Sequence, residues 1–438
     1  MAADALAAPA PRGSSIWRSA AATIGSRAID IPSRYGFHIL VAWKLGLVDA
    51  GAFYIVFSVL TLAAGLGRLG LDRAMTREVA RALALGRPGL ANAVIRRGLV
   101  RIAGLSCVAG AALAAAAPWL AQALFDSPRL TLPLVAAGIA IVPLCVSVGA
   151  AGALAGLHKV GLSQMIYSWL WPALFCIAAV MLPLTLESAL LVIVAATVAT
   201  ALLALVLVAR YRPAEAAAGD VPPLMGLAWS LFTTEIFQLC LAGLPGLVLG
   251  ALAGEAAVGA YAMAWRLALV LNLLVVAVGA MASPRFADQA ARGDGPGLRR
   301  TAAQSMALVL GMGTLPLVVL AVGAPWLLGL FGPGFVSGTA ELRWLLVGQA
   351  VLMLTATAPE LLGMTGHEKP MQRVNTLAIL VYVPALAVAS WWLGGVGAAL
   401  ATLLASVVSG LGAAWLARRR FGFTPLGALV GLVRGRGR

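Results

Sequence analysis

The chain has 438 residues, of which 61% are hydrophobic and only 11% are charged. A soluble protein carries about a quarter charged residues, so this composition excludes a soluble enzyme, a secreted disulfide scaffold and a DNA-binding domain. The net charge of +15 needs no nucleic-acid partner, because Lys and Arg are enriched in the cytoplasmic loops of membrane proteins. We therefore expect most of the chain to lie in a lipid bilayer.

Apolar runs of about 20 residues predict membrane-spanning helices along the whole chain. The uncharged stretch from 374 to 417 is too long for one crossing, and Gly394 and Gly395 offer a turn near its middle. Twelve spans result. They lie near residues 16–43, 51–71, 102–125, 131–157, 160–182, 188–209, 223–252, 256–282, 301–330, 344–366, 374–393 and 396–416.

The predicted fold is an all-α integral membrane protein, with twelve transmembrane helices in two pseudo-symmetric six-helix lobes around a central cleft. The polar segment after residue 209 marks the boundary between the lobes. The predicted parts are an N-terminal tail (1–15), an N-lobe (16–211), a linker (212–222), a C-lobe (223–418) and a basic C-terminal tail (419–438).

The basic residues indicate the orientation of the twelve spans. The loops and tails on the side of the two termini carry 23 Lys and Arg residues, whereas the opposite loops carry three, Lys44, Arg129 and Arg343. The side richer in Lys and Arg is expected in the cytoplasm, so both termini should lie there. Its basic loops and C-terminal tail are expected to contact anionic membrane lipids.

Short motifs of the first half recur in the second half at a nearly constant shift. Two examples are displaced by 208 residues, namely Gly51-Ala52-Phe53 with Gly259-Ala260-Tyr261, and Pro88-Gly89-Leu90 with Pro296-Gly297-Leu298. Six spans per repeat preserve the membrane orientation, so the halves are interpreted as parallel repeats. Such repeats favour a transporter that works by alternating access, with its substrate site at their interface. A scaffold without a transport role is the alternative.

The first span concentrates charged side chains on one helix face. Arg27, Asp30, Arg34 and His38 follow spacings of three and four residues. An ionisable group at the bilayer centre costs at least ~2.5 kcal/mol, so these side chains should face an aqueous cavity or a partner. Local neutralisation of both arginines by Asp30 is the alternative. We favour a cleft-facing stripe that attracts an anion.

The second lobe supplies a matching arginine and a carboxylate. At 1.5 Å per residue, Arg34 lies ~14 Å and Arg266 ~11 Å below the outer rim, so both are expected to bind one anion from opposite lobes. Arg27 and Glu235 lie near the inner side and are expected to pair as an inner gate. Competition of Asp30 for Arg27, with protonation of this network coupling transport to protons, is one alternative, and a neutral Glu235 is another. The predicted polar lining of the cleft is His38, Gln238 and Asn272.

Neither a cofactor nor a metal site is expected. The four cysteines lie in separate apolar runs, and no short spacing of Cys and His residues resembles a zinc or redox site. His158 and His367 each lie beside a lysine at a span end, where capping of the loop or contact with lipid headgroups explains them better than metal ligation.

The chain resembles the multidrug/oligosaccharidyl-lipid/polysaccharide (MOP) exporter superfamily, and within it the polysaccharide-exporting flippases of the Wzx type. The resemblance covers about residues 16–418 and rests on the 6+6 layout and on two segments. These are Ala42-Trp43-Lys44-Leu45-Gly46 before Gly51-Ala52-Phe53, and Gly70-Leu71-Asp72-Arg73 with Arg77. Trp43 stands where the family usually has an arginine, and the two extra spans of lipid II flippases are absent.

The resemblance implies a transporter, not an enzyme, that carries an oligosaccharide on undecaprenyl pyrophosphate across the bacterial inner membrane for O-antigen or exopolysaccharide synthesis. With this substrate, Arg34, Arg266 and Arg27 of the predicted anion-binding cleft are expected to bind the pyrophosphate, and polysaccharide polymerase machinery is an expected partner. The coupling ion, H⁺ or Na⁺, is open. A cation-coupled multidrug or small-molecule antiporter is the alternative, and a membrane glycosyltransferase or polymerase is third.

Reporter fusions test the predicted orientation. A reporter that is active only in the cytoplasm should be active when fused within residues 285–300, because the four arginines of this loop belong to the richer side. The same reporter fused near Arg343 should be inactive. Activity of a periplasmic reporter in the 285–300 loop would contradict both the orientation and the parallel-repeat interpretation.

Overall fold

The computed structural model describes the backbone of residues 13–216 and 222–435, and the side chains of these residues except 13–28, 230, 233 and 234. The predicted linker therefore lies partly outside the described residues. Across the described ranges the chain is almost entirely helical and contains no strand.

Two helices are far too long for one membrane crossing. α1 (Gly13–Arg68) has 56 residues and α14 (Glu368–Phe421) has 54, and 1.5 Å per residue gives each a length of roughly 80 Å. Each is broken at one glycine with a positive φ, Gly46 at 72° and Gly394 at 54°. Glycine adopts such angles without the clash that a Cβ would cause. Each helix therefore doubles back and crosses twice, and the predicted turn at Gly394 is confirmed.

The first bundle combines α1 with the next six helices. α5 and α6 are joined by the π-helical turn η3 (Met165–Trp169) and make one crossing. The helices are α2 (Leu71–Ala84), α3 (Pro88–Trp119), α4 (Thr131–Gly156), α5 (Val160–Gln164), α6 (Leu170–Met181) and α7 (Leu186–Tyr211), with the short turns η1 (Leu120–Leu124) and η2 (Pro128–Leu130) between α3 and α4.

The second bundle repeats this plan. α12 and α13 are bent by 45° against each other and count as one crossing. The helices are α8 (Leu224–Leu252), α9 (Gly254–Ala291), α10 (Gly295–Val322), α11 (Ala324–Gly329), α12 (Thr339–Thr355), α13 (Thr357–Met364) and α14, with η4 (Pro333–Gly338) before α12. Over the described residues these long apolar helices make twelve crossings, which confirms the predicted fold class.

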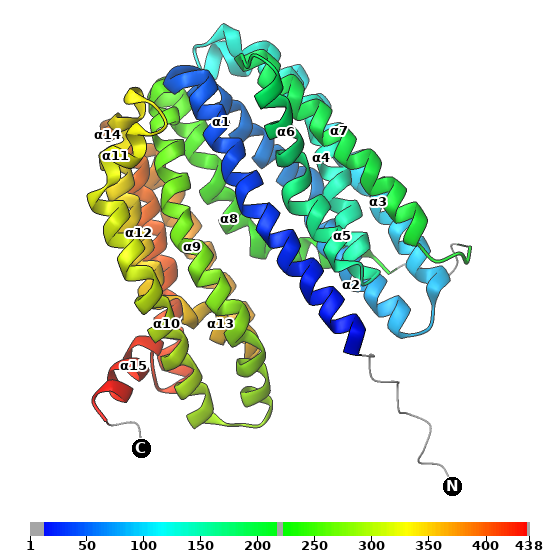
Figure 1. Ribbon diagram of the computed structural model, residues 1–438, viewed down its shortest axis with the longest axis vertical. Coiled ribbons are helices and arrows are strands. Elements are labelled where there is room, and N and C mark those ends of the chain that lie inside the picture. The colour runs from blue at the N-terminus through cyan, green and yellow to red at the C-terminus, as the bar shows by residue number, and fades with distance from the viewer. Residues whose placement is uncertain (1–12, 217–221, 436–438) are drawn as a thin grey trace.

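The two bundles meet at one end and diverge toward the other (Figure 1). The turns at Gly46 and Gly394 lie at the end where the bundles meet, because Leu47 approaches α9 and Gly394 approaches Ala253 just before α9. We call it the arginine-poor end, because the sequence assigns only three Lys and Arg residues to its predicted loops, namely Lys44, Arg129 and Arg343. The opposite end, with the 73–101 and 285–300 segments, is the arginine-rich end. It also carries an unpredicted short helix, α15 (Pro425–Val433), which packs on α10 within the predicted C-terminal tail.

A pair of repeat-related glycines joins the bundles at the arginine-poor end. A Cβ atom on Gly51 would lie 1.8 Å from the carbonyl oxygen of Glu255, and a Cβ on Gly259 would lie 2.4 Å from that of Leu47. These distances leave no room for any side chain at either position, so the backbones of α1 and α9 are in direct contact. The two copies of one sequence motif thus make a direct backbone contact between the lobes.

Polar contacts surround this glycine crossing. Arg129 of the first bundle donates to Asp49 over 2.9 Å and pairs with Glu255 of the second, which also accepts a 2.8 Å hydrogen bond from Ser127. Nearby, the Trp43 indole Nε1 donates to the carbonyl oxygen of Leu330 over 2.7 Å. The lobes are therefore held together at the arginine-poor end by backbone packing, an ion-pair cluster and a side-chain hydrogen bond.

Candidate functional site

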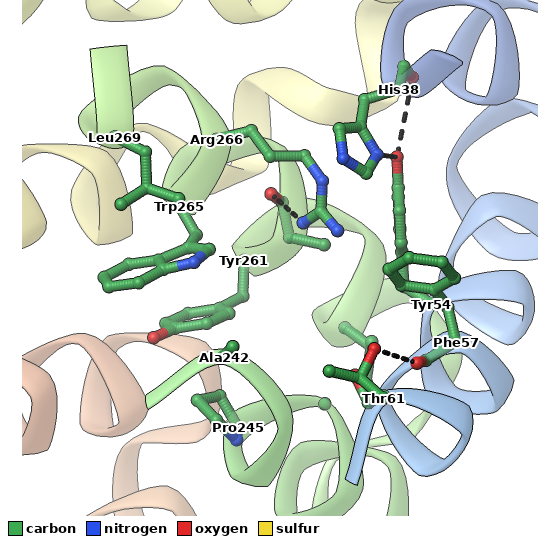
Figure 2. Close-up of a pocket in the computed structure, with 14 residues that line it drawn as sticks. His38, Tyr54, Phe57, Thr61, Ala242, Pro245, Tyr261, Trp265, Arg266 and Leu269 are labelled. Carbon is green, nitrogen blue, oxygen red and sulfur yellow. Dashed lines mark hydrogen bonds between the residues drawn. The ribbon is translucent and has the colours of Figure 1, made fainter. Parts of the chain in front are cut away.

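A cavity of about 160 Å³ lies between the lobes, lined by residues that follow the glycine crossing on α1 and α9, and Figure 2 shows its lining side chains. Both halves of α1 line it from one bundle, and α8 and α9 line it from the other. No described carboxylate is among its lining residues, which are His38, Tyr54, Phe57, Ser58, Thr61, Ala242, Pro245, Gly246, Val258, Tyr261, Ala262, Trp265, Arg266 and Leu269.

Arg266 is the one arginine among the described lining residues, and its guanidinium points into the cavity (Figure 2). Its Nη1 donates to the carbonyl oxygen of Ala262 over 2.8 Å, and its Cζ lies 4.2 Å from the centre of the Tyr54 ring, a cation–π distance. Its Nε is buried and has no hydrogen-bond partner among the described residues. An arginine with an unused buried donor suits an anionic ligand, because unpartnered buried donors are unfavourable.

His38 and Tyr54 fix the surroundings of this guanidinium. The hydroxyl of Tyr54 lies 3.3 Å from Nδ1 of His38 and 3.6 Å from the sulfur of Met263. Tyr54 is 1% exposed, so its ring cannot swing away from Arg266 without repacking. The Tyr54 ring therefore orients the guanidinium, and His38 orients the Tyr54 ring.

Arg34 lies one helical turn from His38 on the same face of α1. It is exposed and forms no hydrogen bond or ion pair with a described residue. Arg34 is not among the residues that line the cavity, whereas His38, one turn further along α1, lines it together with Arg266. The structure thus brings the two predicted anion-binding arginines to one region from opposite lobes. Their binding role stays a prediction.

Asp30 has a partner other than Arg34. Its carboxylate accepts a hydrogen bond from the hydroxyl of Ser168, which lies on the η3 turn. No ion pair joins Asp30 to Arg34 in the structure. The side chain of Arg27 lies outside the described residues, so pairing of Arg27 with Asp30 or with an anion remains a prediction.

Glu235 forms an ion pair with Arg73 at the start of α2. The neighbouring Arg68 lies 4.0 Å from Asp72, and the charges of both act on Glu235. The partner predicted for Glu235 from the sequence was Arg27. In this conformation the carboxylate contacts Arg73, and the predicted contact with Arg27 is untested because that side chain is not described. The ion pair joins α2 of the first bundle to α8 of the second.

The other predicted polar residues lie outside the cavity lining. Gln238 on α8 is exposed and Asn272 on α9 is half-buried. Tyr54 and Arg73 were not predicted as site residues, although Tyr54 directly follows Gly51-Ala52-Phe53 and Arg73 ends Gly70-Leu71-Asp72-Arg73. Among the described side chains, no group of three His, Cys, Asp or Glu residues is placed to hold a metal ion.

The fold is that of MOP superfamily transporters. The chain is similar to the inward-facing conformation of a multidrug resistance MATE family transporter, with a TM-score of 0.72 at 15% identity over 91% of this chain and 98% of that chain. It is similar to the lipid II flippase MurJ in an inward closed conformation, with a TM-score of 0.70 at 14% identity over 95% and 91%. For an outward-facing MATE transporter, the TM-score is 0.55 at 15% identity over 91% and 93%.

Residues 16–289, more than half of the chain, match the family of polysaccharide biosynthesis proteins, and the chain belongs to this family. A search of curated proteins gives no match. The predicted resemblance is therefore confirmed for family and fold: the chain is a multi-pass membrane protein of the polysaccharide biosynthesis family with the fold of MOP superfamily transporters.

The ion pair between Arg73 and Glu235 can be measured by a double-mutant cycle. The side chains of Arg73 and Glu235 are 50% and 24% exposed. We therefore expect a coupling free energy of about 1 kcal/mol, which lies between the values typical of exposed and of buried ion pairs. The variants Arg73→Gln, Glu235→Gln and the double variant should each melt below the wild type in detergent. The double variant should melt above the temperature expected from adding the two single effects.

A second double-mutant cycle, which combines Arg27→Gln with Glu235→Gln, is the control for the pairing of Glu235 with Arg73. Independent effects of Arg27→Gln and Glu235→Gln are expected in the conformation described here. Coupling of Glu235 to Arg27, with none to Arg73, would contradict the observed pair and favour the pair expected from the sequence.

Proposed function

We propose that the protein is a flippase that moves an anionic undecaprenyl-pyrophosphate-linked oligosaccharide across the bacterial inner membrane for polysaccharide biosynthesis. The observation that carries this proposal is the buried, unpartnered Nε of Arg266 at a cavity between the lobes that no described carboxylate lines. Membership of the polysaccharide biosynthesis family supports the class of substrate. O-antigen and exopolysaccharide precursors both have this chemistry.

The pyrophosphate is the part of the substrate that fits the arginines best. A guanidinium donates two parallel hydrogen bonds to phosphate oxygens, and Arg266 and Arg34 would approach one pyrophosphate from opposite lobes. Arg27 lies two turns from Arg34 along α1 and would supply a third charge. A cavity of about 160 Å³ is too small for an oligosaccharide, so the sugars would extend toward the arginine-rich end, where the lobes diverge.

Alternating access would carry the head group between leaflets. The excess of basic residues supports a cytoplasmic location for the arginine-rich end and for both termini, so this conformation would face inward. The higher TM-scores against inward conformations agree with that reading. During the cycle Glu235 would exchange Arg73 for Arg27, and Asp30 would take part in coupling to H⁺ or Na⁺.

Two binding partners besides the substrate are expected at the membrane, namely anionic lipids and a polymerase. The basic loops and the C-terminal tail would contact anionic lipids of the inner leaflet. The enzyme system that polymerises the exported oligosaccharide would receive the product on the outer side, so its polymerase is the expected protein partner.

A cation-coupled multidrug or small-molecule antiporter is the second candidate, because a MATE transporter shares this fold. A cationic drug would need a carboxylate or an open aromatic face at the site. No described carboxylate lines the cavity, and the face of Tyr54 is occupied by Arg266. These observations favour an anionic substrate.

Neutralising the two arginines tests the proposed site. Arg34→Gln and Arg266→Gln should each lower the rate of flipping about tenfold to a hundredfold, because a hydrogen bond to a charged group contributes roughly 1.5–3 kcal/mol. Lysine at either position should restore part of the rate, since it keeps the charge without the planar fork. The measurement is transfer of a labelled undecaprenyl-pyrophosphate oligosaccharide across reconstituted vesicles.

Arg343→Gln is the matched control, because Arg343 is exposed on α12 and lies outside the cavity lining. It should transport at the wild-type rate. A fully active Arg34→Gln, Arg266→Gln double variant would reject the site. A deletion strain with normal glycans and increased drug sensitivity would favour the antiporter.

A further inference from the structure

A second concave surface lies outside the central cavity, at the arginine-rich end of the C-lobe. It has a volume of about 440 Å³ and lies where α14 begins and where it ends. We call it the α14 groove. Its lining residues are Pro370, Arg373, Val374, Trp415, Leu416, Arg419 and Arg420.

The shape of the α14 groove is fixed by packing between the two ends of one helix. Because α14 doubles back at Gly394, its first and last turns lie side by side. A Cβ on Gly412 would lie 2.5 Å from Cγ1 of Val374, so the two halves are in close contact there. The rings of His367 and Phe421 meet at 5.5 Å just beyond the groove. The backbone that carries the arginines is therefore held in place.

The groove carries three positive charges without a described counter-charge. None of Arg373, Arg419 and Arg420 forms an ion pair in the described part of the chain, and no described carboxylate is among the lining residues. Glu368, the carboxylate nearest to Arg373 in the sequence, is exposed and outside the lining. The Cζ atom of Arg419 lies 5.4 Å from the centre of the Trp415 ring, which leaves its N–H groups free for an anion.

The position along α14 places the groove at the boundary between hydrocarbon and headgroups. The stretch from 374 to 417 carries no charge, and Arg373 and Arg418 are the first charged residues on either side. Trp415 is 56% exposed at the same level, as is typical of aromatic anchors at a membrane interface. An anion that reaches this groove would therefore be one attached to a lipid.

The first repeat does not reproduce the residues that line the α14 groove. At the shift of 208 residues, Arg373, Trp415 and Arg419 correspond to Met165, Leu207 and Tyr211, and only Arg420 has an arginine, Arg212, as its counterpart. There the ring of Tyr211 is covered by Lys159, whose Nζ lies 4.8 Å from the ring centre. The duplicated architecture therefore does not require three arginines at this place.

We propose that the α14 groove binds the phosphate headgroup of an anionic phospholipid from the leaflet at the arginine-rich end. Three guanidiniums supply paired N–H donors to the phosphodiester oxygens, and Trp415 packs beside the glycerol backbone. Basic pockets between transmembrane helices bind anionic headgroups in this way. The site lies apart from the central cavity and would exist whatever substrate that cavity carries.

Native mass spectrometry of the purified full chain with phosphatidylglycerol tests this proposal. The wild type should retain phosphatidylglycerol in preference to phosphatidylcholine, and the triple variant R373Q/R419Q/R420Q should bind it at least about tenfold more weakly. The corresponding lysine variant should bind with intermediate affinity. Size-exclusion profiles and melting temperatures in lipid-free detergent establish that the variants are folded.

The matched control is R96Q/R97Q/R101Q, which removes three exposed charges from α3 in the other lobe. It should bind phosphatidylglycerol like the wild type. Equal loss in both triple variants would mean diffuse attraction of charge and would overturn the proposal. Displacement of phosphatidylglycerol by millimolar inorganic phosphate would also overturn it, because the groove would then recognise free phosphate and not a lipid.

Discussion

The contact between Gly51 and Gly259 is the constraint on which the rest of the structure depends. It brings the backbones of α1 and α9 together at the arginine-poor end, and no side chain fits at either position. Tyr54 follows Gly51 by about one turn and Arg266 follows Gly259 by about two turns. The crossing therefore sets the 4.2 Å contact between the Tyr54 ring and the guanidinium. The same two glycines join the lobes and position the candidate site.

Much of the fold is encoded in local patterns that can be read from the sequence. The long uncharged stretch and the glycine pair at 394 and 395 require a turn, because bilayer thickness limits the length of one crossing. The repeated Gly51 and Gly259 motifs identify the two lobes. Arg34 and Arg266 could be placed at similar depth, because helical rise converts residue number to distance. These inferences use only properties of single helices.

The features that the sequence did not predict depend on contacts between helices. Whether Glu235 lies against Arg27 or Arg73 depends on how α8 crosses the first bundle, and no periodicity encodes that crossing. From the sequence, Tyr54 cannot be distinguished from other aromatic residues of the core, because only the packing of α9 places Arg266 on the face of its ring. α15 has only nine residues, too few for a predicted span, and is recognisable as an element only where it packs on α10.

The distance between spin labels at the arginine-poor end tests the central claim most directly. In a cysteine-free background, labels at Leu132 and Val336 report on the two lobes, because both positions are exposed at this end. The wild type should give a short, narrow distribution, and Gly51→Leu should lengthen it by separating α1 from α9. Gly104→Leu, where a side chain meets no neighbour, should leave it unchanged. An unchanged distribution in a folded Gly51→Leu variant would contradict the account.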